Sequence, residues 1–224
     1  MTEKIKVDIY KDVSASTRID TDIAYRGLEK ISETINSDHF EVVNDSHHMR
    51  IGKDESQIVN FNKVNWREPK QNFSIILTDK QVITNANNGA NVFGVAQRFP
   101  INGALKGTAL VNVTATDPEL VVAHEVSHLL GLKYDANTTT PERHCSQLDC
   151  LMSKEMRTEM MMERVAKKGL KGFLERHGYL TAEYQAVEQV ITKDFCPPCI
   201  EKLARQAFFA HKSANGEMVL PGWF

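Results

Sequence analysis

Hydrophobic and polar positions in the first half of the chain follow two different periods. Residues 4–10 alternate apolar and charged side chains, which predicts a strand, whereas residues 21–36 place apolar side chains at helical spacing. A compact apolar run at 73–77 predicts a buried strand, and further strands are predicted at 91–99 and 108–113, separated by a turn containing Gly103 and Gly107. This order predicts an α/β (α+β) fold with helices packed on a mixed sheet.

The second half of the chain has a different pattern. Residues 133–143 are polar, with three consecutive threonines and a proline, and predict a loop. Helices are predicted at 163–177, at 182–191 and, after a proline, at 198–211.

Between these two halves lies a predicted helix at 118–130 that is apolar on both flanks. Asp117 is a suitable N-cap and Pro118 fits the first helical position. Residues 120–123 read Leu-Val-Val-Ala and residues 129–132 read Leu-Leu-Gly-Leu, so the pattern predicts a buried helix. The polar residues enclosed by these flanks therefore need a chemical reason.

The residues between these apolar flanks match the motif H-E-x-x-H-x-x-G. His124 and His128 lie four positions apart, on one helix face, where both imidazoles can bind the same metal ion. Glu125 lies beside the first ligand and is a candidate general base for a metal-bound water. Gly131 follows where a helix can end in a left-handed residue. The alternative is a pair of hydrogen-bonded core histidines without a metal.

Composition sets the class of protein. The chain has 224 residues, of which 42% are hydrophobic and 25% charged, with a net charge of −2. These values are ordinary for a globular protein and give no reason to expect a nucleic-acid partner or an acidic membrane surface. The N-terminus lacks the apolar core of a signal peptide, and no apolar run could cross a membrane. We therefore expect a cytoplasmic protein without a membrane or nucleic-acid partner.

Four cysteines form two short-spaced pairs, Cys145 with Cys150 and Cys196 with Cys199. In a reducing compartment, two such pairs commonly supply four thiolates to a tetrahedral zinc. The alternative is a redox pair, Cys196 and Cys199, which would leave the other two cysteines unexplained. A catalytic zinc usually takes three protein ligands, and His144 is the best candidate for the third, since a structural zinc at Cys145 would hold its neighbour in place.

The combined motifs resemble the archaemetzincin family of zinc peptidases in the metzincin clan, as an outlying member with insertions. The resemblance rests on the helix motif from His124 to Gly131, then His144-Cys145, Cys150-Leu151-Met152, and Cys196 with Cys199. It implies a single catalytic domain over residues 1–224 with a metzincin-like zincin fold. The upper lobe (1–131) would hold the mixed sheet and active-site helix, and the lower lobe (132–224) would be helical and zinc-stapled.

The resemblance also implies the chemistry. It implies one catalytic and one structural zinc ion, a methionine turn at Met152, and hydrolysis of a peptide or protein substrate bound antiparallel to an edge strand. Residues 92–97 are the candidate for that strand. Glu125 would accept the proton of the attacking water. Two functions remain as alternatives: a non-catalytic zinc-binding module, and a thiol oxidoreductase using Cys196 and Cys199.

Two departures from the family pattern mark this chain. The family's third histidine would fall at Tyr134, whereas His144 lies ten residues later, and Asp135 is a competing ligand. Tyr134 could assist the oxyanion, although a surface tyrosine is the simpler interpretation. The segment 153–195 is longer than in the family pattern, which an inserted helix would explain.

Overall fold

The computed structural model describes residues 4–15, 18–51, 58–64, 69–84, 91–101, 104–115, 117–132, 145, 150–152 and 194–214. The chain divides into two compact units, one formed by Met1–Leu132 with Ile200–Phe224 and the other by Lys133–Cys199. The first unit contains the sheet and the helix that carries the H-E-x-x-H motif, and the second contains all four cysteines.

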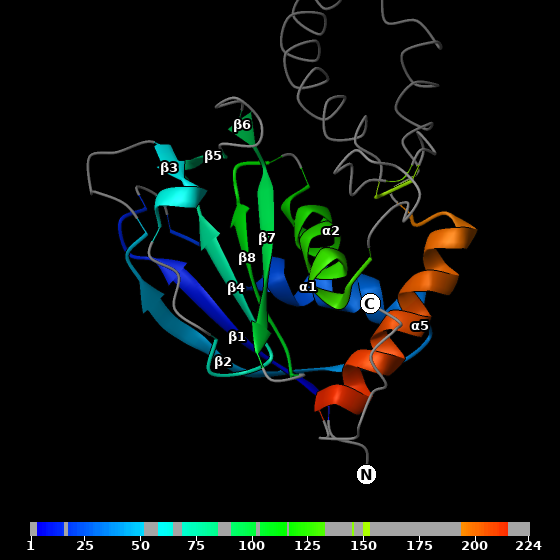
Figure 1. The fold of residues 1–224 in the computed structure, drawn as a ribbon. Coiled ribbons are helices and arrows are strands. Elements are labelled where there is room, and N and C mark those ends of the chain that lie inside the picture. Colours follow the sequence, from blue (N-terminus) through cyan, green and yellow to red (C-terminus); the bar gives the residue numbers. More distant parts are fainter. Residues whose placement is uncertain are drawn as a thin grey trace, which may run out of the picture. The chain divides into compact units, whose positions relative to one another are not determined.

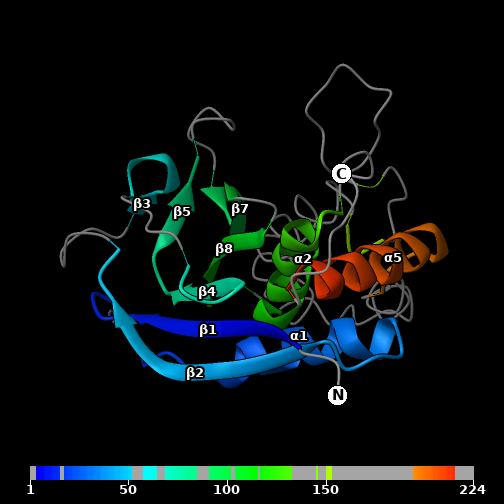
Figure 2. The same ribbon diagram turned by 60° about the horizontal axis from the view of Figure 1, so that its bottom comes forward.

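A five-stranded sheet in the order β2-β1-β4-β8-β7 forms the centre of the first unit (Figure 1). All neighbouring strands are parallel except β7 and β8, which are antiparallel, so the predicted α/β fold with a mixed sheet is confirmed. Figure 2 shows β2 at one border of the sheet, beside β1, and β7 is the strand at the other border. The strands are β1 (Ile5–Asp12), β2 (Phe40–Met49), β4 (Phe73–Thr78), β7 (Gly94–Ile101) and β8 (Ala104–Asn112).

A second apolar layer covers one face of this sheet. It contains a small sheet in the order β3-β5-β6, with a short 3-10 helix, η1, after β3. The layer is joined to Ile76 of β4 and Leu110 of β8 by a buried cluster that also includes Ile51, Val59, Phe61, Val82 and Val92. These elements are β3 (Ile58–Asn60), η1 (Phe61–Lys63), β5 (Gln81–Ile83) and β6 (Asn91–Val92).

Two helices, α1 (Asp22–Thr34) and α2 (Pro118–Leu130), pack against each other, and α2 also packs against β7 and β8. Gly107 of β8 faces Leu129 of α2. Because side chains alternate between the two faces of a strand, α2 lies on the face opposite to Leu110 and its apolar cluster. The helix with the histidines and the small sheet therefore pack on opposite faces of the central strands.

Most of the helices and strands that the sequence predicts within the described residues are present, although their ends differ from the prediction. The strands predicted at 4–10 and 73–77 are β1 and β4, the helices predicted at 21–36 and 118–130 are α1 and α2, and the one at 198–211 is α5 (Pro197–Ala214). The helices predicted at 163–177 and 182–191 and the loop at 133–143 lie outside the described residues. Within the described residues, no helix is long and apolar enough to span a membrane.

Two parts of the sheet differ from the prediction. Gly107 does not belong to a turn but lies inside β8, where it is paired with Arg98. Its small size serves packing, since a Cβ there would lie 2.6 Å from Leu129 Cδ2. The ten-residue strand β2 was not predicted, because this border strand is rich in polar residues and its register with β1 shifts twice.

Candidate functional site

Helix α2 buries nearly all of its surface, as its apolar flanks predict. From Leu120 to Leu130 every side chain is buried except that of His128, which is partly exposed. Pro118 occupies the first turn, as predicted, but Asp117 at the N-cap makes no capping hydrogen bond with its side chain. The helix is thus stabilised by burial, and it brings polar side chains into an apolar surrounding.

The two histidines of α2 face each other. The Nε2 atoms of His124 and His128 are 3.1 Å apart, and the ring planes are inclined by 81°. Two nitrogen ligands at zinc–nitrogen distances of about 2.0–2.1 Å in a tetrahedral site lie about 3.3 Å apart. The converging Nε2 atoms therefore fit two neighbouring positions of one zinc ion, with no change in backbone.

The far side of the His128 ring is held by the end of the helix. Gly131 has φ of 104°, so the chain turns in the left-handed conformation that the sequence predicts. The Gly131 N–H donates to His128 O and the Leu132 N–H donates to Ser127 O. This turn brings the Leu132 carbonyl to 3.0 Å from Nδ1 of His128. An Nδ1–H donated to that carbonyl leaves Nε2 with a lone pair for a metal.

Glu125 lies on the side of α2 that packs against β7. Its side chain is 3% exposed, and a Cβ built on Gly94 would lie 2.8 Å from its Oε1 atom. The carboxyl group is therefore in close contact with the first residue of the border strand. Sequence reasoning did not identify Gly94, or the Leu132 carbonyl, as part of the site.

The other residues predicted to complete the histidine site lie outside the described residues. This applies to His144, the predicted third ligand, to its competitor Asp135, and to Tyr134.

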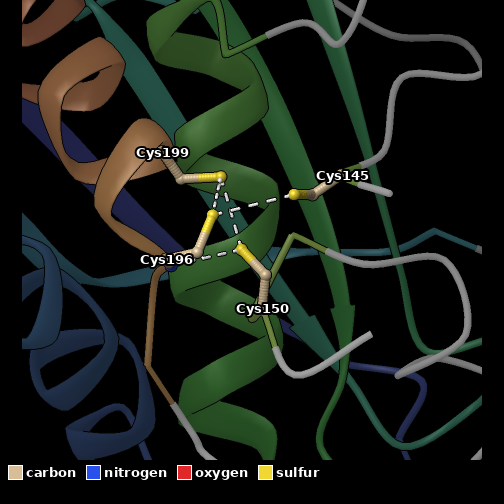
Figure 3. A group of neighbouring side chains, drawn as sticks. All are labelled: Cys145, Cys150, Cys196 and Cys199. Atoms are coloured by element: carbon tan, nitrogen blue, oxygen red, sulfur yellow. Dashed lines mark hydrogen bonds between the residues drawn. The ribbon is translucent and has the colours of Figure 1, made fainter. Parts of the chain in front are cut away.

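The four cysteines come together in the second unit, and all four are buried with free thiols. Figure 3 shows their sulfur atoms pointing toward one another. Cys199 Sγ is 3.2 Å from Cys196 Sγ and 3.3 Å from Cys150 Sγ, and all four sulfurs lie within 4.8 Å of one another. Four sulfurs at about 2.3 Å from a tetrahedral zinc are separated by about 3.8 Å, so this group fits a zinc ion after small side-chain movements.

The environment of the sulfurs favours negative charge at Cys150. A hydrogen bond from the Cys199 thiol, together with backbone N–H groups of Cys196 and Met152 at 3.4 Å, lowers the pKa of Cys150 to about 5 in spite of burial. Burial raises the pKa of Cys196 to about 11. These hydrogen bonds favour the thiolate form of Cys150, the form in which a cysteine binds a metal cation.

Met152 is completely buried in the second unit. Its carbonyl accepts the N–H of Cys145 at 2.7 Å, and the preceding Leu151 N–H donates to Asp194 O at 2.9 Å. These bonds connect the first cysteine pair to the chain just before Cys196. Burial of Met152 is compatible with a methionine turn and equally with an ordinary core residue.

Comparison with known protein families identifies the class of this protein. The family model described as Reprolysin (M12B) family zinc metalloprotease matches residues 22–179. The chain therefore belongs to this family, and it is a zinc metallopeptidase, as the motifs predict. Among solved structures, the chain is similar to archaemetzincin (AmzA) from Archaeoglobus fulgidus, complexed with malonate. The identity is 17% and the TM-score 0.47, over 88% of this chain and 99% of that one. Among curated proteins, none matches this chain.

Proposed function

We propose that this protein hydrolyses peptide bonds at a zinc ion held by His124, His128 and His144, with Glu125 as the general base. The observation that carries the proposal is the convergence of two Nε2 atoms 3.1 Å apart on a helix that also buries Glu125. The choice of His144 rests on the sequence, where it directly precedes Cys145.

A zinc ion bound at these histidines would lower the pKa of water toward neutrality and polarise the scissile carbonyl. Glu125 accepts the proton of the attacking water and returns it to the leaving amine. The burial of its carboxyl group supports this role, because a carboxylate shielded from bulk water exchanges its proton with the reacting groups. His128 keeps Nε2 directed to the metal through its Nδ1 contact with Leu132.

We further propose that substrates bind as an added antiparallel strand on β7. The Asn112 N–H donates to Phe93 O at 2.7 Å, and the next pair in register is Gly94 with Val111. Because bonded and non-bonded pairs alternate in an antiparallel ladder, the backbone groups of Gly94, Ala96 and Arg98 point away from β8. Pro100 alternates in step with these three residues, so the N–H that proline lacks would also point away from β8. The β7–β8 ladder therefore loses no hydrogen bond at Pro100.

This arrangement gives the substrate a direction. An antiparallel substrate runs from the Pro100 end of β7 toward Gly94, where Glu125 lies. The residues on the N-terminal side of the scissile bond would then pair with Ala96 and Arg98. We expect substrates with several residues before the cleaved bond to bind best.

A second, structural zinc ion at the four cysteines completes the proposal, giving two ions per chain. The convergence of all four sulfurs supports it, and so does the lowered pKa of Cys150. The redox alternative is disfavoured, because a pair formed by Cys196 and Cys199 gives no role to Cys145 and Cys150, whose sulfurs lie in the same group.

The test is to compare the wild-type enzyme with Glu125→Gln on a broad peptide library, using zinc-loaded protein. Loss of the base should lower kcat by about 100-fold or more with unchanged zinc content. Glu119→Gln is the matched control, since it makes the same change in the first turn of the same helix and should leave kcat within about twofold.

Each outcome decides between the candidates. A Glu125→Gln variant that cleaves as fast as the wild type contradicts the role of Glu125. A wild-type protein that holds zinc at the histidines but cleaves no peptide supports the non-catalytic zinc-binding module instead.

A further inference from the structure

Gly94 leaves no room for a side chain at the point where β7 meets α2. A Cβ at this position would lie 2.6 Å from Glu125 Cγ, 2.7 Å from Val121 Cγ1 and 2.8 Å from Glu125 Oε1. Carbon atoms in contact normally stay about 3.5–4.0 Å apart, so each of these atoms would have to move. Among the described glycines only Gly131 has positive φ, which means that space, and not backbone conformation, requires glycine at 94.

Two other glycines also face α2, and they provide a comparison. A Cβ on Gly27 of α1 would lie 2.5 Å from Val122 Cβ, and one on Gly107 of β8 would lie 2.6 Å from Leu129 Cδ2. Helix α2 is therefore closely approached by a glycine from α1, from β7 and from β8. The side chains nearest to Gly27 and Gly107 are apolar, whereas those nearest to Gly94 include the carboxylate of Glu125.

We propose that Gly94 is a positioning residue for Glu125, and that the bare backbone of β7 sets the place of the general base. This inference rests on the proposed function of Glu125. A glutamate side chain has three rotatable bonds, and close contact with the strand backbone at Gly94 restricts its conformations. A general base must lie within hydrogen-bond distance of the proton that it accepts, so a displacement of about 1 Å reduces the rate strongly.

The same residue connects the base to the bound substrate. Gly94 is the first residue of β7 whose backbone groups point away from β8, and the carboxylate lies against it. A substrate strand that pairs with β7 is thereby aligned with Glu125 in one register. The strand end serves both to bind the peptide and to place the base.

The first test measures coupling in stability, independently of catalysis. Thermal unfolding of the zinc-loaded protein is compared for Gly94→Ala, Glu125→Ala and the double variant. Gly94→Ala should lower Tm by about 3–6 °C, since one kcal/mol corresponds to about 2–4 °C in a chain of this size. In the Glu125→Ala background the same change should cost less than half as much, because two of the three nearest atoms belong to Glu125 and are removed.

Gly107→Ala is the matched control, since its new methyl group would meet Leu129 and not Glu125. It should lower Tm equally in both backgrounds. Equal losses for Gly94→Ala in both backgrounds would overturn the inference. If the single variant Gly94→Ala does not fold, the double variant with Glu125→Ala should still fold. Failure of both variants to fold would also overturn the inference.

The second test separates positioning from stability. Gly94→Ala should lower kcat by at least about 10-fold with KM changed less than about threefold and zinc content unchanged. Gly107→Ala should keep kcat within about twofold. If Gly94→Ala has the kcat of the wild type while Glu125→Gln is inactive, this inference is wrong and the proposed function stands. If Glu125→Gln has the kcat of the wild type, the proposed function is wrong, and the stability test of Gly94 is still valid.

Discussion

Nδ1 of His128 lies 3.0 Å from the carbonyl oxygen of Leu132, four residues further along the chain. The contact exists because Gly131 reverses the chain with φ of 104° at the end of α2. One glycine thus ends the helix and also brings the carbonyl acceptor to the His128 ring. The glycine of the H-E-x-x-H-x-x-G motif therefore fixes the orientation of this imidazole as well as the end of the helix.

Gly131→Ala should weaken zinc binding as well as folding. An alanine in the left-handed region costs about 1–2 kcal/mol and tends to move the Leu132 carbonyl away from His128. Loss of such an outer contact lowers metal affinity by about 10–100-fold. Competition with a chelator measures the affinity. Gly131→Asn is the control, because asparagine adopts this conformation more readily, and it should retain most of the affinity. Equal losses in the two variants would contradict the role of the turn.

Ala96→Pro should raise KM for peptides without loss of stability. The Ala96 N–H points away from β8, so proline removes a group available to substrate while the β7–β8 ladder stays intact. One hydrogen bond contributes about 1 kcal/mol, which corresponds to about a fivefold increase in KM. Steady-state kinetics on a peptide of several residues gives the answer, with Ala96→Ser as the variant that keeps the N–H. An unchanged KM in Ala96→Pro would exclude β7 as the binding strand.

Asp8 and Asp12 lie on the same strand, and removal of their charge should have opposite effects. Both are buried, 2% and 3% exposed. Among the described residues, Oδ2 of Asp8 has no hydrogen-bond partner, and burial raises the pKa of Asp8 in spite of the nearby His47. Asp12, in contrast, accepts bonds from Ser14 N, Ser14 Oγ and Thr78 Oγ1.

A raised carboxyl pKa means that ionised Asp8 destabilises the fold. This penalty is complete above the folded pKa of Asp8 and disappears as pH falls through that pKa to the ordinary carboxyl range. Asp8→Asn should therefore stabilise the protein at pH 7 and lose this advantage as pH falls below the ordinary carboxyl range. Asp12→Asn should destabilise it by about 1–3 kcal/mol. Denaturant unfolding at pH 7 and pH 4 distinguishes these signs, and a destabilised Asp8→Asn at pH 7 would contradict the argument.

Removal of one cysteine should release one of two zinc ions. Cys199 Sγ lies within 3.3 Å of two other cysteine sulfurs, so Cys199→Ser disrupts the centre of the group. We expect zinc content to fall from two ions to one, with a loss of about 3–5 kcal/mol in unfolding free energy. Elemental analysis and denaturant unfolding provide the measurements. Unchanged zinc content in Cys199→Ser, together with a reversible disulfide in the wild-type protein, would instead favour the redox alternative.

Local signals in the sequence were sufficient to predict the helix that carries His124, Glu125 and His128. The apolar flanks of α2, the proline at its start and Gly131 at its end are all encoded within a few residues, and each lies where the pattern predicts. The convergence of the four cysteines could also be inferred from their spacing, since zinc chemistry constrains it strongly. Helix α1 and strands β1 and β4 follow from periodicity alone.

Contacts between distant segments could not be predicted in this way. A glycine at position 107 predicts a turn when only the neighbouring sequence is considered. Its position inside a strand is explained by the close approach of Leu129, which is distant in the sequence. Gly94 and the Leu132 carbonyl have no sequence signature, because one acts through a missing side chain and the other through the backbone. The cytoplasmic location and the third ligand, His144, stay predictions.

The location of zinc in a crystal of the zinc-loaded protein tests the central claim most directly, through anomalous scattering at the zinc edge. We predict two peaks per chain. One should lie about 2.0–2.1 Å from Nε2 of both His124 and His128, with His144 as the third protein ligand, and the other about 2.3 Å from four cysteine sulfurs. Asp135 in place of His144 would correct the ligand set and keep the mechanism. A protein with full zinc content but no peak between His124 and His128 would contradict the proposed active site.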